Sequence, residues 1–313
     1  MKELLKILEE RVEVLANEPM SRHTSIQVGG PADYYVTVKT AAQLAWICQA
    51  AWRCDAPFFV FGNGTNLLVR DGGIRGLVVE NRASRVRGLK DTAAWAFETI
   101  SIFVESGTSL RGLAMRTAKA GWQGLEWAAG IPGTVGGAVL SNAGAHGGCI
   151  ANAFRSGRVL CANAAKVQEW QPEAFGFTYR RSVLQAETGH RAPSTVVLGV
   201  TLSLQRCEAA TLLARIEKYL GWRRRNQPQL PSAGSVFKNP GRLGAGALIQ
   251  QVGLKGERRG DAQFSPEHAN FIVNLGGARA TDIEMLMALA RQMVKDSFGI
   301  GLELEVQIVG EAA

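Results

Sequence analysis

Histidine and cysteine, which often bind transition metals in proteins, are scarce in this sequence. None of the four histidines falls in an H-x-x-x-H pattern, and none of the five cysteines forms a C-x-x-C pair. An odd number of cysteines without such a pair is typical of reduced thiols, so we expect packing roles for them and a cytoplasmic location. The sequence therefore predicts no metal site. The residues concerned are His23, His146, His190, His268, Cys48, Cys54, Cys149, Cys161 and Cys207.

The sequence also lacks the apolar runs that cross membranes. One stretch of 28 residues, 127–154, carries no Lys, Arg, Asp or Glu, but its glycines and Pro132 argue against a membrane helix. At the N-terminus, apolar residues recur at helical spacing between charged ones. This pattern predicts a surface helix within residues 1–17, and neither a signal peptide nor a membrane anchor.

The composition is that of a globular protein. Hydrophobic residues make up 46% of the 313 residues and charged residues 20%, which excludes general disorder and suggests two or three domains. The net charge of +8 requires either anionic ligands or a nucleic-acid partner. The dense basic cluster Arg223-Arg224-Arg225 follows a helical pattern, and cations stabilise a helix C-terminus. A solvated helix end is therefore the simpler interpretation of that cluster.

Hydrophobic periodicity predicts an α+β chain with many strands in its first part. Longer helices begin near Cys207, so we expect one domain over residues 18–204 and a second over 205–313. The predicted helices are 41–54, 109–120, 209–222 and 281–298, and the predicted strands are 34–38, 58–61, 77–80, 100–105, 158–161, 166–170, 195–204 and 302–308.

A glycine-rich segment, 130–148, holds seven glycines in nineteen positions and no formally charged side chain. Glycine permits positive φ and lets another molecule approach the backbone N–H groups. This composition suits a surface that lies against a bulky ligand. We call the segment the glycine-rich bed and interpret it as a cofactor site.

A second glycine motif, Gly62-Asn63-Gly64, follows a predicted apolar strand. Its amides are suited to phosphate oxygens, but an ordinary hairpin turn explains it about as well. A dinucleotide fingerprint would need glycine where Leu67 stands, and the chain has no G-K-[ST] phosphate loop. Two glycine motifs after separate strands favour one large ligand with a diphosphate and a ring system, such as a flavin.

Three further residues have ordinary interpretations when each is taken alone. Ser235 lies in a polar, turn-prone run that is not the G-x-S-x-G elbow of serine hydrolases. Glu305 lies on the polar face of the predicted last strand, where most glutamates are simply solvated. Arg180 stands beside Arg181 with no distinguishing pattern.

Taken in order, five motifs resemble the UDP-N-acetylenolpyruvoylglucosamine reductase family. They are Gly62 to Leu67, Gly124 to Gly148, Tyr179 to Ser182, Gly234 to Pro240 and Leu302 to Val306, and the likeness runs from about residue 18 to 310. The resemblance implies an FAD-binding domain of the p-cresol methylhydroxylase type, with two α/β subdomains, and a C-terminal α+β substrate-binding domain. It also implies NADPH as reductant and a role in peptidoglycan precursor synthesis.

The resemblance also implies site residues. Arg180 matches the family's catalytic arginine, Ser235 its proton donor and Glu305 its catalytic glutamate. The expected FAD-binding residues are Gly62, Asn63, Gly64, Thr65, Asn66, Leu67, Gly130, Pro132, Gly133, Thr134, Gly136, Gly137 and Asn142. The expected substrate-binding residues are Lys238, Asn239, Lys255 and His268.

Two positions depart from the family pattern. Thr65 replaces the usual serine and keeps its hydroxyl, whereas Gln307 stands where an arginine commonly follows the glutamate. The interval between Arg180 and Ser235 contains Tyr219 as its only tyrosine, which resembles the shorter subtype without a tyrosine loop over the substrate. We expect a monomer with no nucleic-acid or membrane partner. The alternative function is an FAD-dependent sugar or alcohol oxidase.

Overall fold

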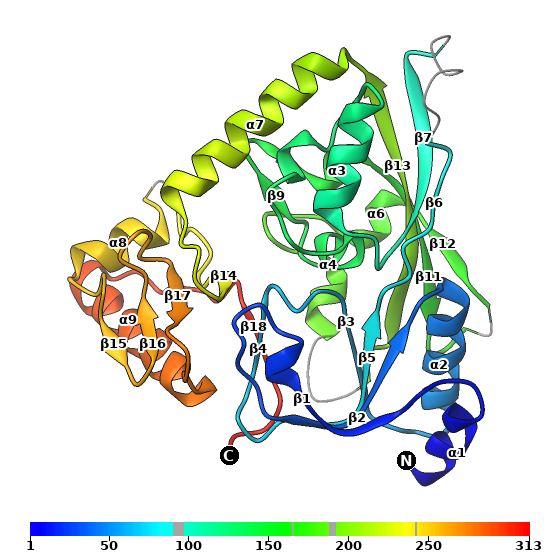
Figure 1. The fold of residues 1–313 in the computed structure, drawn as a ribbon, viewed down its shortest axis with the longest axis horizontal. Helices are drawn as coiled ribbons and strands as arrows, with labels where there is room; N and C mark the ends of the chain where they lie inside the picture. The colour runs from blue at the N-terminus through cyan, green and yellow to red at the C-terminus, as the bar shows by residue number, and fades with distance from the viewer. Residues whose placement is uncertain (90–96, 165, 188–191, 242) are drawn as a thin grey trace. The chain divides into compact units, whose positions relative to one another are not determined.

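The computed structural model describes residues 1–89, 97–164, 166–187, 192–241 and 243–313, and His190 lies outside these ranges. The chain forms two compact units. Unit 1 contains Met1–Leu15, Tyr35–Gly62 and Gly76–Trp222, and unit 2 contains Ala16–Tyr34, Asn63–Arg75 and Arg223–Ala313. Each unit is therefore assembled from separate stretches of sequence (Figure 1).

The two units divide the chain differently from the continuous domains 1–17, 18–204 and 205–313. The strands β2 (Pro31–Val38) and β5 (Ile74–Asn81) each begin in unit 2 and end in unit 1. They belong to a sheet of order β1-β2-β5-β3, with β1 at Leu15–Pro19 and β3 at Phe58–Phe61. The chain therefore enters unit 2 three times. The limits of the functional domains stay a prediction.

The N-terminal helix is shorter than its apolar spacing suggested. Helix α1 covers Lys2–Glu9 and buries Leu4 and Leu8, while Leu15 already begins β1. Pairing of this strand in the sheet decides its conformation, because tertiary hydrogen bonds outweigh the small differences in helix propensity.

Unit 1 contains a six-stranded sheet of order β12-β11-β13-β7-β6, with β8 also paired to β13. Its long central strands pair antiparallel, so that Val200 faces Val104 and Leu202 faces Ile102. All four side chains are fully buried. The strands are β6 (Val86–Arg87), β7 (Thr99–Glu105), β8 (Trp122–Gln123), β11 (Phe154–Cys161), β12 (Gln168–Trp170) and β13 (Thr195–Arg206).

Two helices of unit 1, α2 and α3, begin at side-chain caps. Helix α2 (Ala41–Arg53) is capped by Thr40, and α3 (Leu110–Lys119) by Ser109, whose Oγ accepts from the Gly112 amide at 3.2 Å. Helix α7 spans Ala209–Asn226 and carries the three arginines in its last turn. The smaller elements are α4 (Val135–Leu140), β9 (Gly144–Ala145), β10 (Gly148–Cys149), α5 (Ile150–Ala153) and α6 (Pro172–Phe175).

Unit 2 contains a four-stranded sheet of order β14-β17-β16-β15 together with α8 (Ala245–Gln251) and α9 (Ala280–Phe298). Its strands are β14 (Ser232–Ser235), β15 (Arg258–Arg259), β16 (Ala262–Phe264) and β17 (Phe271–Asn274). Leu248, Phe264, Val273 and Leu286 are fully buried. A separate parallel pair joins β4 (Leu67–Val69) to β18 (Gln307–Val309).

The closing strand predicted over 302–308 is wrong in extent, because β18 covers only Gln307–Val309. Leu304 makes an isolated bridge to Phe237. The amides of Glu305 and Val306 then both donate to the Val236 carbonyl, at 2.8 and 3.3 Å. Two successive amides directed at one acceptor break the ladder, so the polar alternation of this segment does not continue as a sheet.

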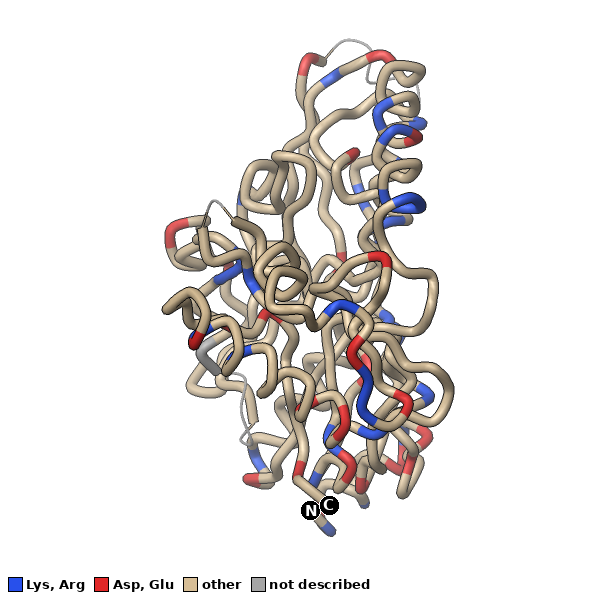
Figure 2. The backbone as a smooth tube through the Cα atoms, turned by 90° about the vertical axis from the view of Figure 1, so that its left-hand side faces the viewer, with Lys and Arg blue, Asp and Glu red and all other residues tan. Residues whose placement is uncertain are grey.

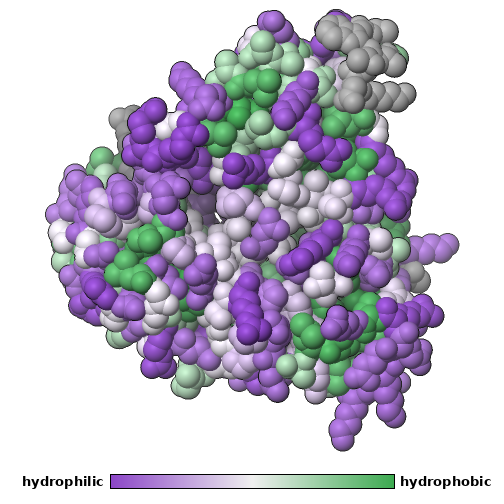
Figure 3. Space-filling view, in the orientation of Figure 1, coloured by the Kyte–Doolittle hydropathy of each residue, from purple (hydrophilic) through white to green (hydrophobic). Residues whose placement is uncertain are grey.

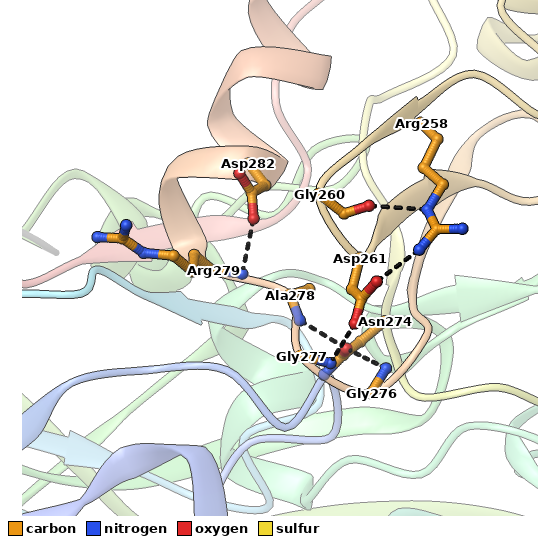
Figure 4. A network of polar contacts seen from close by, with 9 residues as sticks. All are labelled: Arg258, Gly260, Asp261, Asn274, Gly276, Gly277, Ala278, Arg279 and Asp282. Carbon is orange, nitrogen blue, oxygen red and sulfur yellow. Dashed lines mark hydrogen bonds and ion pairs between the residues drawn. The ribbon is translucent and has the colours of Figure 1, made fainter.

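Two polar side chains, Asp71 and Asn274, hold the start of α9 and the loop before it. Asp71 accepts from the Ala280 and Thr281 amides at 2.9 and 3.0 Å and from the Thr281 hydroxyl at 2.7 Å. Asn274 accepts from the Gly276 and Ala278 amides at 2.8 and 3.1 Å (Figure 4). Its Nδ2 also donates to the Ile26 carbonyl at 3.0 Å. The Asp71 contacts satisfy amides that a helix N-terminus leaves open, and the Asn274 contacts hold the loop before the helix.

The charge and hydropathy of the surface are mixed. Basic and acidic residues are interspersed along the backbone in Figure 2, and the face in Figure 3 shows apolar patches between hydrophilic residues. Within the described ranges, no helix is long and apolar enough to span a membrane.

Candidate active site

The glycine-rich bed contains a helix that its composition did not predict. Thr134 caps α4 by accepting the Gly137 amide on Oγ1 at 3.3 Å. The Gly136 amide donates to the Ser106 carbonyl at 2.7 Å, and a Cβ at Gly136 would lie 3.0 Å from that oxygen. The Val135 amide donates to the Thr108 carbonyl at 2.9 Å. The first amides of α4 are therefore bonded within the protein.

The two glycine motifs meet within unit 1. A Cβ on Gly62 would collide with Oγ1 of Thr134 and lie 2.7 Å from its Cγ2. A larger residue at Gly62 would therefore push the loop after β3 away from the bed. This contact places the end of β3 against the N-terminus of α4.

The remainder of the loop, Asn63–Leu67, belongs to unit 2. Gly64 has a φ of +60, and a Cβ there would collide with the His23 carbonyl. Its own carbonyl accepts the Ser25 amide at 3.1 Å. Asn66 donates through Nδ2 to the Glu305 carbonyl at 3.0 Å, so this loop is tied to a predicted catalytic segment.

An orphaned hydroxyl lies beside the bed. Thr108 Oγ1 is buried and has no hydrogen-bond partner among the described residues, although the Thr108 carbonyl accepts the Val135 amide. An unpaired buried hydroxyl costs about 1–3 kcal/mol. The unpaired donor at Thr108, whose carbonyl bonds the first residue of α4, fits a bound polar cofactor. The motif Ser106-Gly107-Thr108 follows β7 as Gly62-Asn63-Gly64 follows β3, a signal that sequence reasoning missed.

Arg180 lies in a tight turn of unit 1. The amides and carbonyls of Thr178 and Arg181 bond one another at 3.0 and 3.2 Å, and Arg180 has a φ of +54. Asn142 donates through Nδ2 to the Thr178 carbonyl at 2.8 Å and accepts the Ala151 amide at 3.3 Å. The side chain of Asn142 is thus bonded to protein backbone, an arrangement that its place in the glycine motif did not reveal.

The segments that carry Ser235 and Glu305 are joined by backbone hydrogen bonds in unit 2. Ser235 ends β14 opposite Phe271. The carbonyl of the next residue, Val236, accepts the Glu305 amide at 2.8 Å. The Val236 amide donates to the Asn270 carbonyl at 2.8 Å. Val236 is therefore bonded through both its amide and its carbonyl. Seventy residues of sequence separate the two predicted catalytic groups, yet a backbone hydrogen bond links their segments.

The predicted substrate-binding residues have different surroundings. The Lys238 ammonium lies 3.4 Å from the Glu303 carboxylate, and the Asn239 side chain accepts the Ala245 amide at 3.0 Å, at the start of α8. Lys255 is exposed, with Nζ 3.4 Å from Gln250 Oε1. Arg180 belongs to unit 1, whereas these residues, Ser235 and Glu305 belong to unit 2.

The surroundings of His268 favour its neutral form. Burial lowers the pKa of His268, a backbone hydrogen bond acts in the opposite direction, and the positive charge of Lys255 lowers the pKa further. Nδ1 accepts the Asn270 amide at 3.2 Å, so in the neutral ring the proton lies on Nε2. Nε2 is therefore the hydrogen-bond donor of the neutral ring.

No group of three or more His, Cys, Asp or Glu side chains in the described part of the chain is placed to hold a metal ion.

Two family models match this chain. The family model for an FAD binding domain matches residues 32–167, and that for the C-terminal domain of UDP-N-acetylenolpyruvoylglucosamine reductase matches 227–309. The reductase of that name from Chloroflexus aggregans is 43% identical over 297 residues, which cover 94% of this chain and 96% of that protein. This chain belongs to the UDP-N-acetylenolpyruvoylglucosamine reductase family.

Further relatives support the same membership. UDP-N-acetylenolpyruvoylglucosamine reductase 2 from Symbiobacterium thermophilum is 42% identical over 308 residues, covering 98% of this chain and 96% of that one. The crystal structure of the reductase from Thermus caldophilus matches with a TM-score of 0.76 at 37% identity, covering 95% and 98% of the two chains. The family resemblance, the fold class and the assignment as an FAD-binding oxidoreductase are confirmed.

Proposed function

We propose that this member of the reductase family uses NADPH and bound FAD to reduce the enolpyruvyl ether of UDP-N-acetylglucosamine to UDP-N-acetylmuramate. The product serves peptidoglycan precursor synthesis. The observation that carries the proposal is the hydrogen bond between the Glu305 amide and the Val236 carbonyl, at 2.8 Å. It joins the segments of the proposed proton donor, Ser235, and the proposed catalytic glutamate.

The glycine motifs and the orphaned hydroxyl would hold the cofactor. The small or turn-forming residues that would lie along the cofactor are 62–67 and, in the glycine-rich bed, Gly130, Pro132, Gly133 and Thr134. Gly136 keeps α4 close to Ser106, and the Thr108 hydroxyl supplies an unused donor. Asn142 contributes by holding neighbouring backbone. When bound, FAD supplies hydride transfer from NADPH to the substrate's methylene carbon.

The proposed catalytic side chains act on the enolpyruvyl group. Reduction of the methylene carbon moves negative charge toward the carboxylate, and the Arg180 guanidinium stabilises that charge with two parallel N–H donors. Ser235 gives its hydroxyl proton to the adjacent carbon, and Lys238 eases that proton loss by its positive charge. Glu305 acts beside the substrate carboxylate.

The proposed substrate-binding residues offer two kinds of contact, a positive charge and a hydrogen bond from a neutral group. Lys255 is the exposed cation suited to the diphosphate, whereas neutral His268 suits a carbonyl or hydroxyl acceptor. Asn239 supports the entry to α8 through Ala245. We expect a monomer that needs no nucleic-acid partner, since the anionic substrates account for part of the basic charge.

The variant Ser235→Ala tests the proposal. NADPH should reduce its flavin within about twofold of the wild-type rate, because hydride delivery to flavin needs no proton donor. Turnover of the enolpyruvyl substrate should fall at least about 100-fold, as expected for loss of a general acid. Ser232→Ala, on the same strand, is the matched control.

Retention of turnover within a few-fold in Ser235→Ala would defeat the assignment of the proton donor. A purified protein that is colourless and that added flavin does not reconstitute would defeat the cofactor assignment.

A further inference from the structure

The turn that carries Arg180 holds an unfavourable backbone conformation. Arg180 has a φ of +54, at a turn position where glycine or asparagine is usual. Such a conformation costs a residue with a Cβ about 1–2 kcal/mol, so surrounding contacts must impose it. The contacts that hold this turn therefore decide where the guanidinium lies.

Two side-chain hydrogen bonds hold the turn, one on each side of Arg180. Ser182 is 1% exposed, and its hydroxyl donates to the Leu140 carbonyl at 2.7 Å. Asn142 is 8% exposed, and its Nδ2 donates to the Thr178 carbonyl at 2.8 Å. Both bonds tie the turn to the C-terminal end of α4. One reaches Leu140, the last residue of the helix, and the other is made by Asn142, two residues beyond it.

Helix α4 connects the two hydrogen bonds at the Arg180 turn to the N-terminal part of the glycine-rich bed. Leu140 is the last residue of α4, and its carbonyl is one that a helix end leaves without an intrahelical partner. Gly136 and Thr134 lie at the other end of the helix, against Ser106 and Gly62. Six residues of helix thus link the Arg180 turn to Ser106 and Gly62, all within unit 1.

We propose that Ser182 and Asn142 are positioning residues that set the place of Arg180 relative to the flavin bed. The inference rests on the proposed function, because it needs Arg180 to stabilise the substrate carboxylate. Neither residue is assigned a contact with substrate. Each acts by holding backbone on one side of the turn, and a displacement of about 1 Å at a reacting group can cost about 100-fold in rate.

A double-mutant cycle tests this positioning role. The enzyme is first reduced with NADPH, and its oxidation by the enolpyruvyl substrate is then followed in a single turnover by the visible absorbance of the flavin. The variants are Ser182→Ala, Arg180→Ala and the double variant. Ser182→Ala should slow this step about 10- to 100-fold. The double variant should match Arg180→Ala within about twofold, because Ser182 then has no guanidinium to place.

The variant Asn142→Asp gives an independent measurement. Aspartate tolerates the positive φ of 41 at this position and keeps an acceptor for Ala151, but it replaces the donor to Thr178 with an acceptor. Asn142→Asp should therefore slow the same step, again without further effect in an Arg180→Ala background. In Ser182→Ala, flavin reduction by NADPH and FAD affinity should stay within about twofold, which a general loss of structure would not allow.

Ser141→Ala is the matched control. It removes a serine hydrogen bond to the Gly137 carbonyl at 3.0 Å, one residue after α4, but that bond does not reach the turn. Its oxidation step should match the wild type.

The outcomes separate the two proposals. If Ser182→Ala and Asn142→Asp each slow the Arg180→Ala enzyme by the same factor as the wild type, or slow neither, the positioning role is overturned and the proposed function stands. If Arg180→Ala itself oxidises at the wild-type rate, the role of Arg180 in the proposed function and the positioning role are both overturned.

Discussion

Replacement of Thr108 by valine should change the apoprotein and the cofactor complex in opposite directions. The Thr108 hydroxyl is buried without a partner among the described residues, and the side chain as a whole is 5% exposed. Valine has nearly the same shape and removes the unpaired polar atom. Because an unpaired buried hydroxyl costs about 1–3 kcal/mol, the free energy of unfolding of the apoprotein should rise by about 1 kcal/mol.

The same change should weaken FAD binding. A hydrogen bond contributes about 0.5–1.5 kcal/mol net, so its loss should raise the FAD dissociation constant about fivefold, for a central figure of about 1 kcal/mol. Urea unfolding of the flavin-free protein measures the first effect. Titration with FAD, followed by the quenching of flavin fluorescence, measures the second.

The variant Thr117→Val is the matched control. Thr117 is fully buried in the same unit, but its hydroxyl already donates to the Ala114 carbonyl at 3.1 Å. Its replacement should lower or leave unchanged the stability of the apoprotein and leave FAD affinity as it was. An FAD dissociation constant within twofold of wild type in Thr108→Val, or a destabilised apoprotein, would refute the assignment of this hydroxyl to the cofactor.

Three further predictions concern stability and protonation. Asn274→Ala should lower the free energy of unfolding by about 2–3 kcal/mol in urea, because buried backbone groups lose their partner; exposed Gln292→Ala should change it by less than about 0.5 kcal/mol. Burial alone would raise the pKa of Asp71, but hydrogen bonds from Thr281 and neighbouring groups bring it below its ordinary value. Its stabilisation is thus present above about pH 3.9 and lost as pH falls through the folded pKa, so Asp71→Asn should flatten acid unfolding. Lys255→Ala should raise the pKa of His268 in an NMR titration, since the Lys255 charge lowers it.

Local signals were sufficient for several elements of unit 1. The apolar run Phe58–Phe61 forms β3 as predicted, and α3 begins at Leu110, one residue inside the predicted range and directly after its cap Ser109. Helix α2 also begins at the predicted Ala41. In each case the pattern and the terminating residue lie within a few positions of one another, so nearby sequence determines the conformation.

Other segments depended on distant partners. The alternation at 302–308 predicted one strand, but the Val236 carbonyl takes two successive amides and ends it. Leu15 fits a helical pattern, yet it begins a strand of a sheet that includes β5. The helix inside the glycine-rich bed was not expected, because six residues with two glycines carry little intrinsic helix propensity and depend on the Thr134 cap.

The sequence by itself determined the types of residue available to this protein. It supplies glycine-rich segments that a large ligand could approach and an arginine, a serine and a glutamate in family motifs. It contains no metal-binding pattern. Tertiary structure alone decided which of them meet. Gly62 lies against Thr134, the Glu305 amide bonds Val236, Thr108 keeps an unused hydroxyl, and Ser182 anchors the Arg180 turn to α4. The physical reason is that hydrogen bonds and close contacts between residues far apart in the chain exist only once folding has brought their backbones together.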